Sequence, residues 1–218
     1  MRATNIDEFL FSELLIFEKV FGEYINNESK NSENYQENSI STINNLVTDP
    51  KNTYVLSFNY TEVDPEKVSH VEYVHGKSTK DIIFGIDTVG LDAGTDEYRY
   101  SKTYRKLLMN VENQKHESLP KEVDKIVFFG HSLSLADFSY FQSIFDFYSI
   151  YDSTIELKFV FSVYDETKRS EIINNQLKSV TSLFSVYGKK MMNSHQGQNM
   201  LHKLILENRI KVVEIENS

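Results

Sequence analysis

One stretch decides the fold of this chain: Lys125-Ile126-Val127-Phe128-Phe129-Gly130-His131-Ser132-Leu133-Ser134-Leu135-Ala136-Asp137. An apolar run ends there at a Gly-His-Ser turn, and a predicted helix begins close to Asp137. The run at residues 126–129 has no polar alternation, which is typical of a parallel strand covered on both faces. In open α/β sheets, ligands bind where such a strand gives way to a helix N-terminus, whose dipole favours anions. The stretch therefore predicts an α/β fold with a ligand site at this turn.

Two further predicted strands also end in polar residues. Residues 54–59 lead to Asn59, and residues 71–74 lead to His75 and Gly76. Because three such ends in one short chain favour a shared cleft, we predict that these side chains converge with the turn at the carboxyl ends of the strands. The predicted lining residues are Asn59, His75, Gly76, Gly130, His131, Ser132 and Asp137.

Each of these side chains suits a particular task. His75 is the expected general base or ribose-orienting group, since an unperturbed imidazole titrates near about pH 6.5. Asn59 offers a donor and an acceptor to a hydroxyl or an amide. His131 and Ser132 offer donors to an anionic or sugar group, and Asp137 is placed to orient His131. Since Asp137 would repel phosphate, we expect a neutral, ribose-like group beside it.

The rest of the chain alternates between the two periodicities. Helix spacing predicts helices at residues 7–26, 39–47, 97–111, 135–149, 168–187 and 198–208. Residues 27–38 are almost entirely polar and predict a loop. Runs rich in Val, Ile and Phe predict further strands at residues 82–85, 157–163 and 210–215. We therefore expect one α/β domain over residues 1–218, with a helical portion at 1–50 and a mostly parallel, Rossmann-like three-layer sheet at 51–218.

Composition excludes several classes of protein. The 218 residues carry a net charge of −9, which disfavours broad binding to nucleic-acid phosphates. Cysteine is absent, so disulfides, zinc-thiolate sites and thiol nucleophiles are excluded. The histidines lack the spacing of a metal site, and we predict none. No apolar run approaches a membrane span and no signal peptide is recognisable, so we expect a cytoplasmic protein.

Two alternatives to a ligand-binding enzyme stay open. The first predicted helix carries an apolar stripe that must be covered by the sheet or by a partner chain, which favours a non-catalytic assembly module that forms homo-oligomers. The turn also invites comparison with the serine-hydrolase nucleophile elbow, with Ser132 as nucleophile and His195 as its base. Ser134 stands where the elbow has its second glycine, and no acid is singled out. The members of the helical stripe are Leu10, Leu14, Phe17, Phe21 and Tyr24.

Four motifs in series resemble the AbiH family of bacteriophage abortive-infection proteins. They are Ser57-Phe58-Asn59-Tyr60-Thr61, Val74-His75-Gly76, Ile83-Phe84-Gly85-Ile86-Asp87, and the stretch from Gly130 to Asp137 with Tyr140-Phe141. The resemblance implies a role in phage defence. Family members usually begin with an apolar strand and a Gly-Asn-Gly-Phe-Asp-like turn, so this chain resembles the later part of the family's architecture and looks N-terminally shortened.

The same series is similar to the sirtuin-like fold. Asn59 matches the asparagine loop of that fold, His75-Gly76 its catalytic histidine, and residues 130–132 its turn near the nucleotide ribose. Some sirtuin-like domains of anti-phage systems hydrolyse NAD. The resemblance therefore implies NAD or a related nucleotide as the small-molecule partner, with weak or no cleavage where the glycine-rich phosphate cradle is missing.

Overall fold

The computed structural model describes residues 6–62, 68, 70–86, 90–112, 119–134 and 137–215. The chain divides into two compact units, with residues 1–119 in unit 1 and residues 120–217 in unit 2. Each unit combines helices with a small parallel sheet, which confirms the predicted α/β class. The prediction of a single domain with a Rossmann-like three-layer sheet spans both units, so it stays a prediction.

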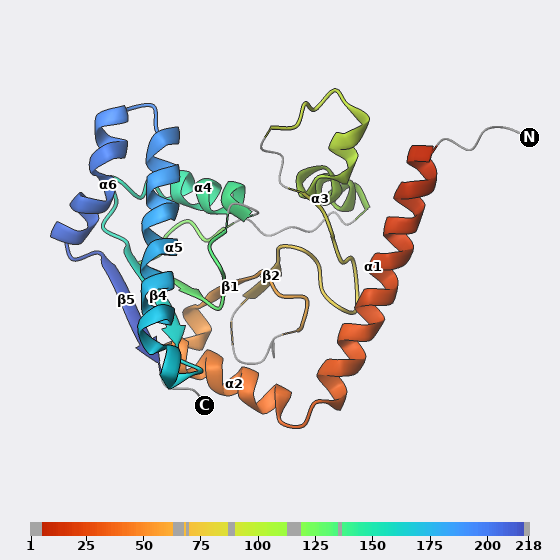
Figure 1. Ribbon diagram of the computed structural model, residues 1–218, viewed down its shortest axis with the longest axis horizontal. Helices are drawn as coiled ribbons and strands as arrows, with labels where there is room; N and C mark the ends of the chain where they lie inside the picture. Colours follow the sequence, from red (N-terminus) through yellow and green to blue (C-terminus); the bar gives the residue numbers. More distant parts are fainter. Residues whose placement is uncertain are drawn as a thin grey trace, which may run out of the picture. The chain divides into compact units, whose positions relative to one another are not determined.

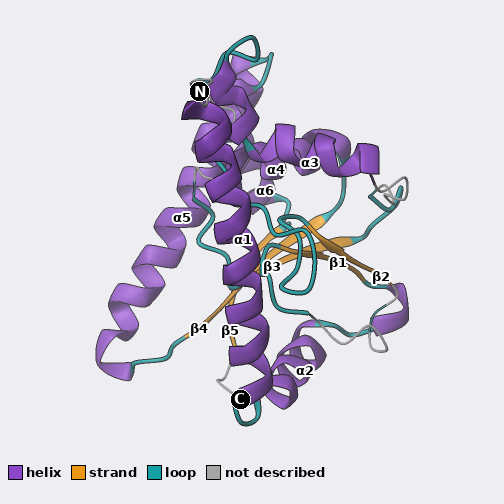
Figure 2. Ribbon diagram, turned by 90° about the vertical axis from the view of Figure 1, so that its right-hand side faces the viewer, coloured by secondary structure: helices purple, strands orange, loops and turns teal. Residues whose placement is uncertain are grey.

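The sheet of unit 1 has two strands. In chain order, the described elements are α1 (Ile6–Asn31), α2 (Tyr35–Leu46), η1 (Pro50–Asn52), β1 (Tyr54–Ser57), β2 (His70–Tyr73), η2 (Asp96–Tyr100) and α3 (Lys102–Glu112). β1 and β2 pair in parallel, with Ser57 opposite Tyr73 at their carboxyl ends (Figure 2). The residues that follow these two positions therefore emerge at the same edge of the sheet.

A buried ion pair holds α1 in unit 1. Arg105 of α3 donates to both carboxylate oxygens of Glu18, with Nη1–Oε1 at 3.0 Å and Nη2–Oε2 at 2.6 Å. The two side chains are only 7% and 6% exposed. The same carboxylate accepts the backbone N–H of Phe84 at 2.8 Å, and the Phe84 ring packs edge-on against Phe21 of α1 at 4.9 Å. One carboxylate thus joins α1, α3 and the loop that carries Phe84.

The loop predicted at residues 27–38 is wrong over most of its length. α1 continues to Asn31, and α2 already begins at Tyr35. The Tyr35 hydroxyl donates to Thr61 Oγ1 at 2.6 Å, so the one aromatic residue of this polar segment is anchored in unit 1. Such tertiary contacts override local composition.

The strand predicted at residues 82–85 is also wrong. This segment is a loop, and Ile83 in it is only 1% exposed. Its N–H donates to the carbonyl of His75 at 2.8 Å, while the next N–H goes to Glu18. The segment is apolar because it lies in the core of unit 1, and the N–H groups of Ile83 and Phe84 are satisfied without a strand ladder. The helix predicted at residues 97–111 is confirmed as α3, preceded by the separate 3-10 helix η2.

The sheet of unit 2 has three parallel strands in the order β3-β4-β5. The elements are β3 (Lys125–Phe129), α4 (Phe138–Phe147), β4 (Glu156–Ser162), η4 (Glu166–Lys168), α5 (Arg169–Lys190), α6 (Ser194–Leu206) and β5 (Ile210–Ile215). The predicted strands and helices of this region are confirmed, although the predicted start of α4 falls on residues 135–136, outside the described residues. α5 and α6 run side by side (Figure 1) and touch at Gly188 and Gly197, where a β-carbon on Gly197 would lie 2.0 Å from the Gly188 carbonyl oxygen.

The core of unit 2 is aromatic. Phe128 of β3 stacks on Phe159 of β4 at 4.7 Å, and Phe145 of α4 stacks on Phe184 of α5 at 5.5 Å. Phe138, Phe141 and Phe145 are 4% exposed or less, so this face of α4 belongs to the core. These rings pack α4 and α5 against the sheet.

β3 departs from the predicted cover on both faces. It lies at one edge of the described sheet, and none of its five residues is buried. Phe129, its last residue, is 37% exposed. The uninterrupted apolar run therefore marks a strand that packs through Phe128, without the double cover that the pattern predicted.

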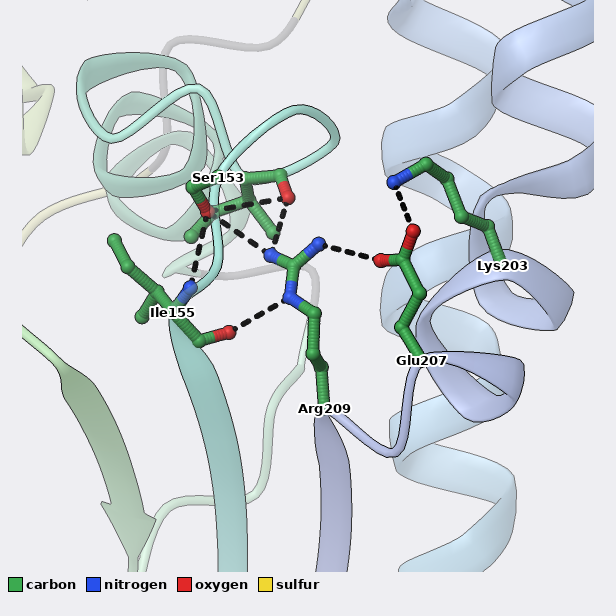
Figure 3. A network of polar contacts seen from close by, with 6 residues as sticks. Ser153, Ile155, Lys203, Glu207 and Arg209 are labelled. Carbon is green, nitrogen blue, oxygen red and sulfur yellow. Dashed lines mark hydrogen bonds and ion pairs between the residues drawn. The ribbon is translucent and has the colours of Figure 1, made fainter.

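One arginine fastens the start of β5 to the loop before β4 (Figure 3). Arg209 donates from Nε to the carbonyl of Ile155 at 3.0 Å and from Nη2 to the carbonyl of Ile150 at 2.6 Å and to Ser153 Oγ at 2.9 Å. Glu207 accepts from its Nη1 at 3.0 Å. Because each of the three guanidinium nitrogens donates a hydrogen bond, the buried charge of Arg209 has a structural role.

Candidate functional site

The turn after β3 has an unusual backbone. Gly130 has a φ of +65° and Leu133 a φ of +54°, so both lie in the left-handed region. A non-glycine residue there is strained by about 1–2 kcal/mol, and such residues concentrate at functional sites. A β-carbon on Gly130 would meet no heavy atom within 4 Å. The backbone at the end of β3 is therefore open to close approach by a ligand.

The side chain of His131 holds this turn in place. Its Nδ1 accepts the backbone N–H of Leu133 at 2.9 Å, which leaves Nε2 as the protonated nitrogen, 3.1 Å from Oδ2 of Asp137. The ring packs edge-on against Phe141 at 5.0 Å. Asp137 does orient His131, as expected, and its side chain forms no capping bond at the start of α4. Both nitrogens of the imidazole are engaged. Because Nδ1 binds the N–H of Leu133, the ring stabilises the strained conformation of that residue.

An open cavity of about 360 Å³ adjoins this turn within unit 2. Its lining combines four serines and one lysine with four apolar residues, and these come from the turn, from the start of α4 and from α5. The lining residues are Ser132, Leu133, Ser134, Phe138, Lys178, Ser179, Ser182, Leu183 and Val186. This volume is near the lower end of the range for small-molecule sites. The cavity is therefore large enough for a compact ligand that joins a polar group to a small apolar ring.

The α5 residues of this lining were missed by reasoning from the sequence. Lys178 and Ser182 are four residues apart on the exposed side of α5, where a charged or polar residue is ordinarily a solvated surface position. Their significance depends on α5 packing against a turn more than forty residues earlier in the chain. No local pattern carries that information.

Unit 1 brings a second group of predicted residues to one edge of its sheet. Asn59 and His75 each lie two residues beyond the paired positions Ser57 and Tyr73. Asn59 is exposed, whereas His75 is 5% exposed and packs edge-on against Phe58 at 5.5 Å. Asn59 and His75 therefore follow matching positions of two paired strands, at the same edge of the sheet in unit 1.

Gly76 has a clear structural reason to be glycine. Its φ is +77°, and a β-carbon there would lie 1.7 Å from the carbonyl oxygen of Asp81. A turn this tight excludes every other residue. A role for Gly76 in ligand binding stays a prediction, and so does the convergence of Asn59 and His75 with the turn after β3, because the two groups belong to different units.

The serine-hydrolase alternative receives no support from the turn. Both nitrogens of His131 are occupied, and among the described residues no hydrogen bond joins Ser132 to a histidine. His195 lies exposed in the first turn of α6, where its N–H donates to Asn193 Oδ1. A histidine-activated serine needs direct contact with its base.

Within the described ranges, no group of three or more His, Cys, Asp or Glu side chains is placed to hold a metal ion. Nor is any helix in the described part of the chain both long enough and apolar enough to cross a membrane.

Fold and turn together define an α/β protein of parallel strands with a histidine-clamped turn after a sheet strand. A family model described as bacteriophage abortive infection AbiH matches residues 7–159, from the start of α1 into β4. The chain belongs to the AbiH family, as the four sequence motifs predicted. No curated protein and no solved structure matches the chain significantly.

Proposed function

We propose that this AbiH-family chain acts in abortive-infection defence against bacteriophage by binding a nucleotide, with NAD as the leading candidate, at the turn after β3. The observation that carries the proposal is the turn itself. Gly130 leaves its backbone open, His131 fixes the strained Leu133, and the cavity begins at Ser132. A protein keeps such strain where a site must be preorganised.

The proposal includes a Rossmann-like arrangement for the sheet. The supporting observation is the order β3-β4-β5 in unit 2, with every strand parallel and helices in each connection. In sheets of this kind, the carboxyl ends of the strands form the ligand crevice. The turn after β3 lies at such a carboxyl end.

The proposed reactive groups are Asn59 and His75, which follow the same sheet edge within unit 1. Asn59 would hold a hydroxyl or an amide of the ligand, and His75 would act as a base or orient the ribose. Their common sheet edge in unit 1 supports a joint role. If the family's activity is NAD cleavage, a form that carries the glycine-rich phosphate cradle should lose it on His75→Ala or Asn59→Ala while the far-ultraviolet circular dichroism stays unchanged.

The test is NAD binding by isothermal titration calorimetry and NAD cleavage by product chromatography, with phage plaque counts on bacteria that express each variant. His202→Ala is the matched control, since His202 is an exposed histidine of α6. Loss of plaque protection in His75→Ala but not in His202→Ala supports the proposed site. Equal protection by all variants, with no NAD binding, would refute it.

A second candidate function is homo-oligomeric assembly through α1. Six large apolar side chains of α1 are between 54% and 74% exposed, and they recur at helical spacing along one side. They are Ile6, Phe9, Ile16, Phe17, Val20 and Tyr24. The proposed occupant of this face is α1 of a second copy. At roughly 150–250 Å² for a whole aromatic side chain, the face offers several hundred Å² per copy, which approaches the roughly 800 Å² of a standard interface.

Light scattering coupled to size-exclusion chromatography tests this assembly. The wild-type chain should have the mass of a dimer, and Val20→Glu should give a monomer because it places a charge in the apolar face. Glu23→Lys, a charge change on the same helix, is the control and should leave the dimer intact. A wild-type mass of one chain at high protein concentration would contradict the assembly.

A further inference from the structure

We infer that the cavity beside the turn binds the phosphate group of the ligand, with Lys178 as the cationic partner. This inference rests on the proposed function and names the chemistry of part of that site. The cavity lies in unit 2 and is lined from the turn by Ser132 and Ser134 and from α5 by Lys178, Ser179 and Ser182.

Charge is the first reason. The whole chain has a net charge of −9, yet the described residues that line this cavity include one lysine and no aspartate or glutamate. The nearest acidic residue in the chain to the turn, Asp137, is absent from the lining and faces His131 at 3.1 Å. An anion in the cavity would therefore meet a cation without an adjacent acidic lining residue.

Hydrogen-bonding capacity is the second reason. Ser132, Ser134, Ser179 and Ser182 line the cavity, and each carries a hydroxyl group that can donate one hydrogen bond. A phosphate has several acceptor oxygens, so hydroxyls and an ammonium from two sides match it. Hydrogen bonds to an ionised group are the strong ones, and they favour phosphate over an uncharged sugar at this position.

The apolar lining indicates what the phosphate is attached to. Leu133, Phe138, Leu183 and Val186 line the same cavity as the polar groups. Inorganic phosphate leaves this surface uncovered, whereas a nucleoside monophosphate covers part of it. We therefore expect a nucleotide phosphate to bind more tightly than the free ion.

The experiment is calorimetric titration of the full chain with inorganic phosphate, adenosine monophosphate, adenosine and NAD, all at one ionic strength because exposed charges are screened by salt. The variant is Lys178→Gln, and Lys189→Gln is its matched control on the same helix outside the cavity. We expect adenosine monophosphate to bind more tightly than phosphate, adenosine not to bind, and Lys178→Gln alone to weaken both phosphate ligands about tenfold. Ser182→Ala should weaken them less.

The outcomes separate this inference from the proposed function. Phosphate binding that depends on Lys178, without any NAD binding, supports the phosphate site and counts against NAD as the ligand. NAD binding that Lys178→Gln leaves unchanged supports the proposed function and overturns the phosphate site. Equal weakening by Lys178→Gln and Lys189→Gln means general charge attraction and also overturns it.

Discussion

Removing the carboxylate of Glu18 should destabilise unit 1 more than any exposed charge change. In the structure this carboxylate accepts three hydrogen bonds, two from Arg105 and one from the backbone of Phe84, and the side chain is 6% exposed. Loss of one partner from a buried ion pair costs about 3–5 kcal/mol, because the other charge stays buried. The Phe84 N–H adds about 1 kcal/mol when its acceptor is lost. Glu18→Ala should therefore remove a large part of the roughly 5–15 kcal/mol that stabilises a typical domain.

Amide hydrogen exchange measured by mass spectrometry reads the two units separately, which a single unfolding curve does not. Protected amides of β1 should exchange roughly a hundredfold faster or more in Glu18→Ala, since each 1.4 kcal/mol is about a factor of ten. Amides of β4, in unit 2, serve as the internal reference. Glu18→Gln should cost less, because its side-chain oxygen still accepts from Phe84.

Two further variants test whether burial of the ion pair is the cause of the destabilisation. The pair Lys106–Glu72 lies in the same unit with side chains 22% and 24% exposed, so Glu72→Gln should cost about 1 kcal/mol or less. The double variant Glu18→Leu with Arg105→Met should recover most of the stability, because it removes both buried charges. If Glu18→Ala has no greater effect than Glu72→Gln, the buried pair does not hold α1 to α3 and this reasoning fails.

Three other predictions concern unit 2. Gly197→Ala should destabilise it by about 1–3 kcal/mol, because its methyl group would overlap the Gly188 carbonyl, and a thermal unfolding curve identical to wild type would contradict this. His131→Phe should keep the ring contact with Phe141 but release the N–H of Leu133, so the Leu133 amide should exchange faster while the β4 amides do not. Ser132 should not react with a fluorophosphonate probe, and stoichiometric labelling that Ser132→Ala abolishes would restore the serine-hydrolase interpretation.

The strands of unit 2 were predictable because parallel strands are continuous apolar runs with clear polar ends. Residues 210–215 were predicted with the bounds that β5 has. The strand at residues 82–85 failed for the same reason, since an apolar run reports burial and not the partner of its backbone groups. There the donor of Phe84 is satisfied by Glu18, sixty-six residues earlier, and no local pattern records that contact.

In the candidate site too, contacts within one segment could be predicted, whereas contacts that depend on tertiary packing could not. The six-residue spacing of His131 and Asp137 allowed their contact to be predicted, because both belong to one strand-turn-helix segment. The sequence did not indicate that His131 would use Nδ1 to hold Leu133, since that bond depends on the positive φ of Leu133. Lys178 was out of reach because it meets the turn only through the packing of α5.

The family match covers one side of the candidate site and not the other. The match over residues 7–159 takes in the turn, its histidine clamp and the sheet edge with Asn59 and His75, and it ends inside β4. The α5 side of the cavity, with Lys178 and Ser182, lies beyond the matched residues. The family match therefore spans the turn but carries no information about the cation. Phosphate recognition by this chain has to be decided by the Lys178→Gln titration, whatever other members of the family prove to bind.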